Sequence, residues 1–141
     1  MGNKDDDYLI EIVDAFARKK VGTLLVETGK GSFDIESGIS EANWLILRDS
    51  HNRVLAYSIN DGQLGQRFFG ANVAINPVAS QIVVENHPGE LTLYDLNSGD
   101  SQGRFVLKNR AAFARFSLDG KRLFVLTENQ TAYAFDLASK P

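Results

Sequence analysis

The two histidines of this chain have side chains that could move a proton near neutral pH and could also hold a metal ion. His51 lies in the segment DSHNR and His87 in ENHPG, and each follows a carboxylate, Asp49 or Glu85, by two residues. A metal site needs three or four ligands at a recognisable spacing, and the sequence has no spacing motif of that kind. We therefore expect both histidines in solvated turns, with no bound metal and no cofactor.

Other patterns that could carry catalysis are incomplete. Asp5, Asp6 and Asp7 could offer oxygen ligands to calcium, but such ligands need a loop that wraps around the ion. The segment GKGSF at 29–33 lacks the spacing of a phosphate-binding loop, and no Ser-His-acid set can be assigned. The chain has no cysteine, which excludes disulfides and thiolate chemistry. We therefore expect a protein that is not an enzyme.

Charged residues at the ends of the expected strands are the remaining candidate site. Three of them, Arg53, Lys108 and Arg110, are basic, and the turns that carry them are expected at one end of the sheets. Basic side chains gathered there could bind an acidic protein surface, although a solvated rim is the simpler interpretation for any one of them. The residues that we predict to bind protein are His51, Arg53, His87, Glu90, Lys108 and Arg110.

Length and charge restrict the classes of partner. The chain has 141 residues, 15 basic and 18 acidic, so its formal net charge is −3 and its length fits one domain. A mildly acidic chain lacks the broad basic surface that binds nucleic acid. The N-terminal segment has no signal-peptide pattern, and no apolar stretch approaches the roughly 18 residues of a membrane span. We therefore expect a cytoplasmic protein without nucleic-acid partners or a transmembrane segment, which could still dock onto a membrane complex.

An internal repeat indicates how these residues are positioned. Three segments align, and they span 33–70, 71–108 and 109–141. The first two match at a spacing of 37 residues at the pairs Tyr57–Tyr94, Gly62–Gly99, Arg67–Arg104 and Phe68–Phe105. The third follows the second by 41 residues at the pairs Tyr94–Phe135, Asp95–Asp136 and Leu96–Leu137. The third copy therefore carries a small insertion.

Each repeat contains the signals of four short strands. In the second repeat these are NVAIN, QIVVEN, LTLYDL and GRFVLK, separated by the turns PVAS, HPGE and NSGDSQ. Apolar runs bounded by Gly, Pro, Asn and Ser are typical of strands. Four strands in about 40 residues are the pattern of one blade of a β-propeller. We therefore predict an all-β fold with three four-stranded antiparallel blades, which form a partial propeller.

The first 32 residues differ from the repeats. Four apolar residues between Leu9 and Phe16 have helical spacing, with an acidic run before them and two lysines after them. Acidic residues suit the N-terminal end of the helix dipole and basic residues its C-terminal end. The pattern predicts one short α-helix from about 6 to 19, followed by the strand GTLLVETG. We expect residues 1–32 to cap one edge of the blades.

The repeated residues resemble WD40-type propeller repeats over about 33–137. LTLYDLNSG and AYAFDLAS are similar to the strand that carries Trp-Asp in that family, with Tyr-Asp and Phe-Asp in its place. ARFSLDGKRLFVLTEN is similar to the family's F-S-x-D-G-x-x-L entry into a blade, and the Gly-His pair of the family is absent. The resemblance implies a divergent, bacterial-style β-propeller that binds other proteins.

The N-terminal segment has a second resemblance. LIEIVDAFARKKVGTLLVETGKGSFDIESG is similar to PATAN-type modules of bacterial regulatory proteins, in which a helix precedes two strands of the form R-K-T-G-x-L-x-V. This similarity covers about 30 residues and implies a regulatory or sensory module.

Three blades are too few to close a ring, because closed propellers have about four to eight. The ring could be completed by association of chains, the N-terminal segment could cover an edge or add GTLLVET to the last blade, or the chain could be one piece of a larger assembly. We predict a non-catalytic scaffold subunit of a larger complex, which binds protein partners or itself through open blade edges. The alternatives are a bacterial regulatory or sensory module and a small-ligand binding domain.

Overall fold

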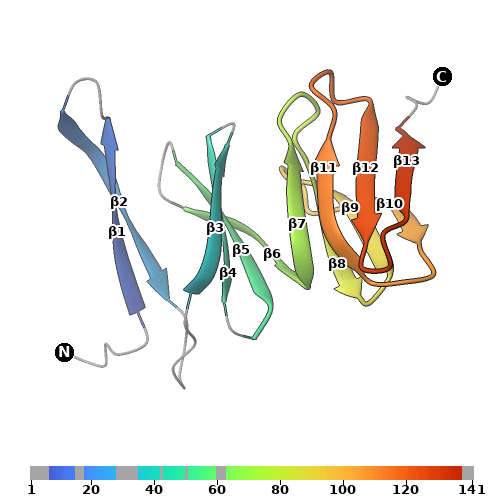
Figure 1. Ribbon diagram of the computed structural model, residues 1–141. Helices are drawn as coiled ribbons and strands as arrows, with labels where there is room; N and C mark the ends of the chain where they lie inside the picture. Colours follow the sequence, from blue (N-terminus) through green and yellow to red (C-terminus); the bar gives the residue numbers. More distant parts are fainter. Residues whose placement is uncertain are drawn as a thin grey trace. The chain divides into compact units, whose positions relative to one another are not determined.

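The computed structural model describes residues 7–14, 18–27, 35–41, 43–49, 51–59 and 63–137, and within these ranges every regular element is a β-strand (Figure 1). The all-β prediction is confirmed. No helix long and apolar enough to cross a membrane lies in the described ranges. The chain divides into two compact units, Met1–Arg67 and Phe68–Pro141, and each is described by itself.

The first unit holds a hairpin and a four-stranded sheet. The hairpin pairs β1 (Asp7–Asp14) with β2 (Lys19–Glu27). The sheet has the antiparallel order β3-β4-β5-β6, and its strands are β3 (Ile35–Glu41), β4 (Trp44–Asp49), β5 (Arg53–Ser58) and β6 (Leu64–Phe69), the last of which ends just past the unit boundary.

The predicted N-terminal helix is wrong, because strand β1 occupies most of its range. The same segment also fits the two-residue period of a strand, because Tyr8, Ile10 and Ile12 are apolar at every second position. Ile10, Ile12 and Val13 are β-branched, which favours a strand over a helix. The helix implied by the PATAN-type resemblance is contradicted for the same reason. The predicted strand GTLLVETG lies largely within β2.

The second unit holds two antiparallel sheets, one with four strands and one with three among its described residues. The first has the order β7-β8-β9-β10, and its strands are β7 (Ala71–Asn76), β8 (Gln81–His87), β9 (Glu90–Asp95) and β10 (Ser101–Val106). The other has the order β11-β12-β13, and its strands are β11 (Ala111–Phe116), β12 (Arg122–Thr127) and β13 (Ala132–Asp136).

Strand positions follow the spacing of the sequence repeat. β4 and β8 begin 37 residues apart, at Trp44 and Gln81, and β8 and β12 begin 41 residues apart. The predicted insertion has two parts. The linker before β7 is one residue, Gly70, whereas the linker before β11 is the four residues 107–110. The turn after β11 is also one residue longer than the turn after β7.

The N-terminal hairpin repeats the β9–β10 hairpin at a spacing of 81 residues. In β1–β2 the register runs from Ile12 opposite Gly22 to Val13 opposite Lys20, with a bulge between the two pairs. In β9–β10 it runs from Leu93 opposite Gly103 to Tyr94 opposite Ser101, with the same bulge. The turns match as well, since Arg18 and Gly99, which are 81 residues apart, both have a positive φ, of 57° and 80°. The hairpin is therefore a further copy of the third and fourth strands of the repeat.

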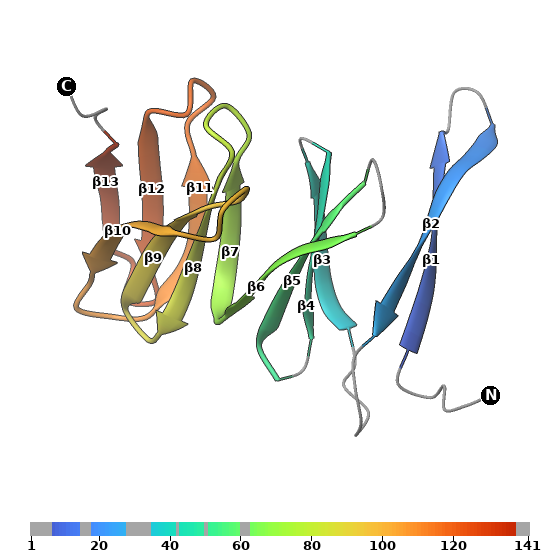
Figure 2. The same ribbon diagram turned by 180° about the vertical axis from the view of Figure 1, so that it is seen from behind.

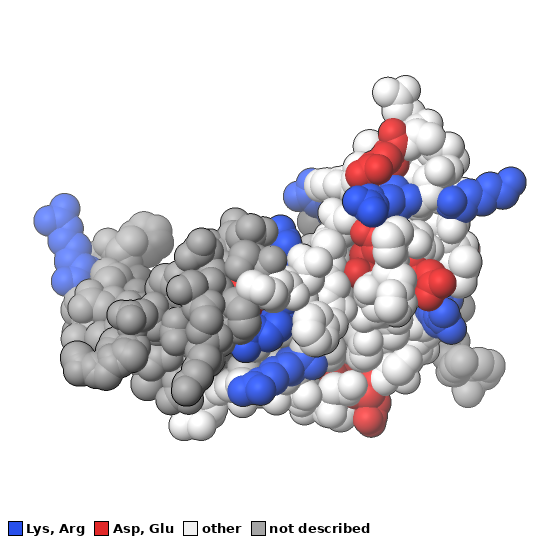
Figure 3. Space-filling view, turned by 90° about the horizontal axis from the view of Figure 1, so that it is seen from below, with Lys and Arg blue, Asp and Glu red and all other residues white. Residues whose placement is uncertain are grey.

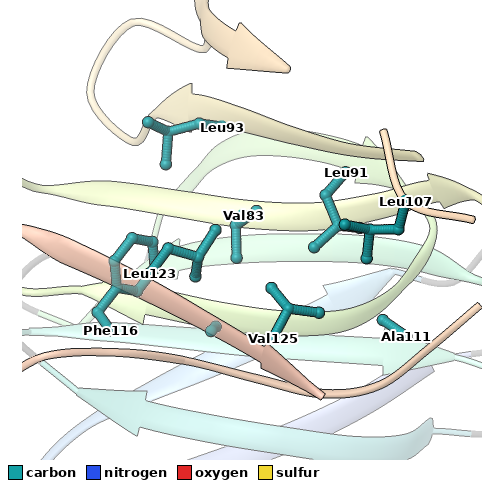
Figure 4. Packing of buried hydrophobic residues seen from close by; sticks show 9 residues of the cluster. Val83, Leu91, Leu93, Leu107, Ala111, Phe116, Leu123 and Val125 are labelled. Carbon is teal, nitrogen blue, oxygen red and sulfur yellow. The ribbon is translucent and has the colours of Figure 1, made fainter. Parts of the chain in front are cut away.

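The core of the second unit lies between its two sheets (Figure 4). Strand β12 shows why, because its residues alternate between exposed and buried along its whole length. Its buried residues Leu123 and Val125 pack with Val83, Leu91 and Leu93 of the β7–β10 sheet. Strands β7 and β11 lie side by side in both ribbon views (Figure 2). The two sheets of this unit therefore form one packed sandwich.

Candidate functional site

A buried polar residue closes the turn between the second and third strands in each of the three larger sheets. These residues are Asp49, Glu85 and Thr127. Each side chain accepts a hydrogen bond from the backbone N–H group four residues further along the chain. The donors are Arg53, Gly89 and Thr131. Sequence reasoning missed this shared position because an aspartate, a glutamate and a threonine occupy it.

Asp49 organises the turn that carries two of the predicted binding residues. Its Oδ1 accepts the N–H groups of His51 at 2.9 Å and Arg53 at 3.0 Å, and its Oδ2 accepts Arg53 Nε at 2.6 Å. Burial acts to raise the pKa of Asp49, but the hydrogen bonds from Arg53 and His51 and the charge of Arg53 outweigh burial and hold that pKa below its ordinary value. The Arg53 guanidinium and the Asp49 carboxylate therefore build the turn itself.

Glu85 joins its own turn to the next sheet. Its Oε2 accepts the N–H groups of Gly89 and Ala111, both at 2.8 Å, and its Oε1 accepts Asn72 Nδ2 at 2.7 Å. Asn72 Nδ2 also donates to the carbonyl of Ala111 at 2.7 Å. Both backbone groups of Ala111, the first residue of β11, are thus bound by side chains of the β7–β10 sheet.

A second polar contact joins the same two sheets at the opposite ends of β7 and β11. The buried side chain of Asn76 donates from Nδ2 to the carbonyl of Gly120 at 2.9 Å and accepts the N–H of Val78 at Oδ1. Gly120 has a φ of 73°, and a Cβ placed on it would lie 2.6 Å from Asn76 Oδ1. The turn therefore requires glycine, and the two sheets are fixed to each other at both ends.

The predicted residues of the first unit are His51 and Arg53. His51 lies in the β4–β5 turn and Arg53 is the first residue of β5, and both donate backbone N–H groups to Asp49. Their position is therefore set by a buried carboxylate.

The four predicted residues of the second unit lie at one end of its sheets. His87 and Glu90 are register partners at the β8–β9 turn, and Lys108 and Arg110 lie in the β10–β11 linker. The N–H of Leu107 donates to the carbonyl of Gly89 at 2.7 Å, which joins this linker to that turn. The structure therefore brings these four residues into adjacent turns, and their binding role stays a prediction.

Charges at this end of the second unit are mixed. Glu90 Oε1 accepts a hydrogen bond from Arg104 Nη2 at 2.9 Å. The acidic residue Glu128 lies next to the basic residue Arg110, because its backbone N–H donates to the carbonyl of Arg110. In the part of Figure 3 that shows this unit, acidic and basic side chains are interspersed. Among the described residues, no three His, Asp or Glu side chains are grouped as a metal would require.

An apolar surface that sequence reasoning missed lies on the side of the β11–β13 sheet that faces away from the core. Phe113, Phe124 and Leu126 are 50%, 39% and 41% exposed there. Leu126 is paired with Phe113 across β11–β12, so the two share one face of the sheet. The signal was present in RLFVLT, a run that is apolar on both faces of a strand.

Comparisons with known proteins identify the fold alone. No family model matches the chain, and no curated protein matches it. The solved structure entitled "Structure of U3-55K", a WD40 protein, matches 77% of this chain with a TM-score of 0.64 and 8% sequence identity. The match covers 38% of the U3-55K chain. The likeness shows the fold alone: over the matched part, the chain has an all-β fold of the kind found in a WD40-type structure.

Proposed function

We propose that this chain is a non-catalytic scaffold subunit that binds other proteins within a larger assembly. On this proposal the three larger sheets are blades of a partial propeller, and the predicted N-terminal cap is the β1–β2 hairpin. The buried carboxylates support a structural role over a catalytic one, because Asp49 and Glu85 accept hydrogen bonds that build turns. Fold likeness alone does not give function, so the proposal rests on one surface.

That surface is the edge of strand β13 that faces away from β12, which pairs with no strand among the described residues and is called the open edge. Thr127 donates its N–H to the carbonyl of Thr131, and Leu137 donates its N–H to the carbonyl of Lys121. Hydrogen-bonded and non-hydrogen-bonded pairs alternate along an antiparallel ladder. The backbone N–H and C=O groups of Tyr133 and Phe135 are therefore the ones that hydrogen-bond to β12. The backbone groups of the residues between them point to the open edge. These residues are Ala132, Ala134 and Asp136.

The β7–β10 sheet supplies a template for what this edge binds. Asp95 corresponds to Asp136 by the repeat, and its N–H donates to the carbonyl of Asp100 at 2.9 Å, at the turn into β10. Leu93, which corresponds to Ala134, is the register partner of Gly103 in β10. A fourth strand is therefore the natural ligand of β13, and an extended segment of a partner protein can provide it by strand addition.

Strand β13 is fixed in position by aromatic contacts. Phe135 packs against Phe105 of the neighbouring sheet with ring centroids 4.6 Å apart, and Tyr133 stacks beside Phe135 at 5.9 Å. These aromatic contacts fix β13 from the side that faces the core. A strand that is already extended and rigid loses little conformational entropy when it binds.

The test removes one outward N–H without changing the core. Ala134→Pro deletes a donor that points to the open edge, which an edge strand tolerates. Ala134→Ser is the matched control, because it changes the same exposed position and keeps the N–H. We expect tagged wild type and Ala134→Ser to copurify the same partner from native extracts, and Ala134→Pro to lose it while its thermal unfolding remains cooperative. Equal recovery of the partner with all three chains would contradict the proposal.

A further inference from the structure

The apolar side of the β11–β13 sheet forms one continuous patch, which we call the outer face. Leu126 lies opposite Phe113 on one side and Ala132 on the other, and Phe124 lies opposite Ala134 in the next row. Side chains directly opposite each other in neighbouring strands are in contact distance. The outer face consists of the apolar residues Phe113, Phe124, Leu126, Ala132 and Ala134, with Arg115 beside Phe124 and the exposed Arg122–Asp136 ion pair at one end.

The repeat identifies what this face corresponds to in the preceding sheet. Three of its residues follow buried residues of the β7–β10 sheet by 41 positions. The pairs are Val83–Phe124, Leu91–Ala132 and Leu93–Ala134. Val83, Leu91 and Leu93 are 0%, 0% and 5% exposed, because the next sheet covers them. The same positions are exposed in the β11–β13 sheet among the described residues.

The β11–β13 sheet covers the β7–β10 sheet with a few apolar residues. Leu123 and Val125 from the middle strand and Phe116 from the inner strand meet the buried face of the β7–β10 sheet (Figure 4). The partly buried Tyr133 and Phe135 pack against the same cluster. A sheet built from this repeat is therefore complementary to a face built from the same repeat.

We infer that the outer face binds a β-sheet of a second copy of this chain, stacked as β11–β13 stacks on β7–β10. The inference deepens the proposed function and rests on it, because it names the partner of one part of the scaffold. A second copy fits because the three larger sheets among the described residues follow one repeat, and the β1–β2 hairpin keeps the register of β9–β10. The contact continues an interface that the chain already forms with itself.

Such a contact joins two different surfaces, so it is head-to-tail. Contacts of this type close into a ring or extend into a filament. The described residues form four sheets, counting the β1–β2 pair, and two copies would hold eight. Closed propellers have about four to eight blades, so a ring of two copies falls within that range.

The size of the outer face sets the strength of the contact. Three strands of about six residues span roughly 14 Å by 20 Å at ordinary strand and residue spacings. This is less than the roughly 800 Å² per partner of a stable interface, so the association should be weak and concentration-dependent. A range from roughly 10 μM to 1 mM is therefore needed to detect it.

Sedimentation velocity over that range tests the inference with three variants. Phe124→Asp and Leu126→Asp place a charge on the outer face but leave the β13 edge unchanged. Leu118→Asp is the matched control, because Leu118 is fully exposed in the turn between β11 and β12 of the same sheet. Circular dichroism and thermal unfolding establish that each variant is folded, and Ala134→Arg, at an exposed alanine of the face, replaces any variant that is not.

We expect the sedimentation coefficient of wild type and Leu118→Asp to rise with concentration toward that of a dimer. The outer-face variants should weaken this association by at least about tenfold, as loss of a central apolar contact does. A wild type that stays monomeric throughout, or an association that the outer-face variants do not weaken, overturns the inference. If wild type is monomeric but Ala134→Pro still loses a copurifying partner, the inference fails and the proposed function stands. The two failures are therefore distinguishable.

Discussion

Glu85 accepts the backbone N–H of Ala111, 26 residues further along the chain, at 2.8 Å. The same oxygen accepts the N–H of Gly89, so one buried carboxylate fixes both the end of its own hairpin and the start of the next sheet. Together with the contact of Asn76 with Gly120, this bond fixes the β11–β13 sheet in place. The open edge and the outer face are therefore presented on a rigid support.

Replacement of Glu85 by Gln should weaken that support. A Gln oxygen can still accept from Gly89 and Ala111, but its NH2 group then faces the Asn72 Nδ2 donor. A buried donor without an acceptor costs about 1–3 kcal/mol, which urea unfolding would measure. Glu90→Gln is the control, because Glu90 has an exposed ion pair with Arg104 worth about 1 kcal/mol or less. Equal losses in the two variants would contradict the role of Glu85.

Replacement of Gly120 by Ala should also destabilise the second unit. The φ of 73° is unfavourable for alanine, and the added Cβ would meet Asn76 Oδ1 at 2.6 Å. We expect a loss of about 1–3 kcal/mol in the free energy of unfolding. Gly103→Ala is the comparison, since a Cβ there meets only Leu93 Cβ at 4.0 Å. A stability loss that is the same for both alanines would rule out the Asn76 contact as its cause.

The stability of the first unit should depend on pH through Asp49. Its folded-state pKa is lowered, so the stabilisation is present above the unfolded pKa of about 3.9 and is lost as pH falls toward the folded value. Asp49→Asn should therefore be less stable than wild type at neutral pH, and the difference should shrink near pH 3. Fluorescence of Trp44, the single tryptophan of the chain and a residue of β4, reports the unfolding. A difference that is independent of pH would exclude Asp49 as its source.

The repeat made most of the strands predictable. A spacing of 37 residues carries Tyr57 to Tyr94, and the strands around them, β5 and β9, begin at the same spacing. Leu9, Ile12 and Phe16 fit a helical period, whereas Tyr8, Ile10 and Ile12 fit the two-residue period of strand β1. Local spacing alone therefore does not decide between a helix and a strand in this segment. The match of β1–β2 to β9–β10 lies in backbone register, which the residue types do not display.

The candidate site was harder to predict for physical reasons. The repeated Asp95 stabilises the turn after β9, because its Oδ1 accepts the N–H groups of Asn97 and Ser98. The role of Glu85 cannot be read from the sequence, because its bond to Ala111 depends on how two sheets meet. Charged residues in turns can be identified from the sequence. The exposure of Phe124 cannot, because it depends on which face of the sheet is covered.

Amide hydrogen exchange in strand β13 tests the central claim, that this sheet edge is free to bind a partner, most directly. In the dilute chain the N–H groups of Ala132 and Ala134 should exchange rapidly, while those of Tyr133 and Phe135, which pair with β12, should exchange slowly. In the assembled protein the outward pair should become protected while the inward pair changes little. Protection of Ala132 and Ala134 in the dilute chain, or rapid exchange of both after assembly, would contradict the claim that β13 is the edge that binds.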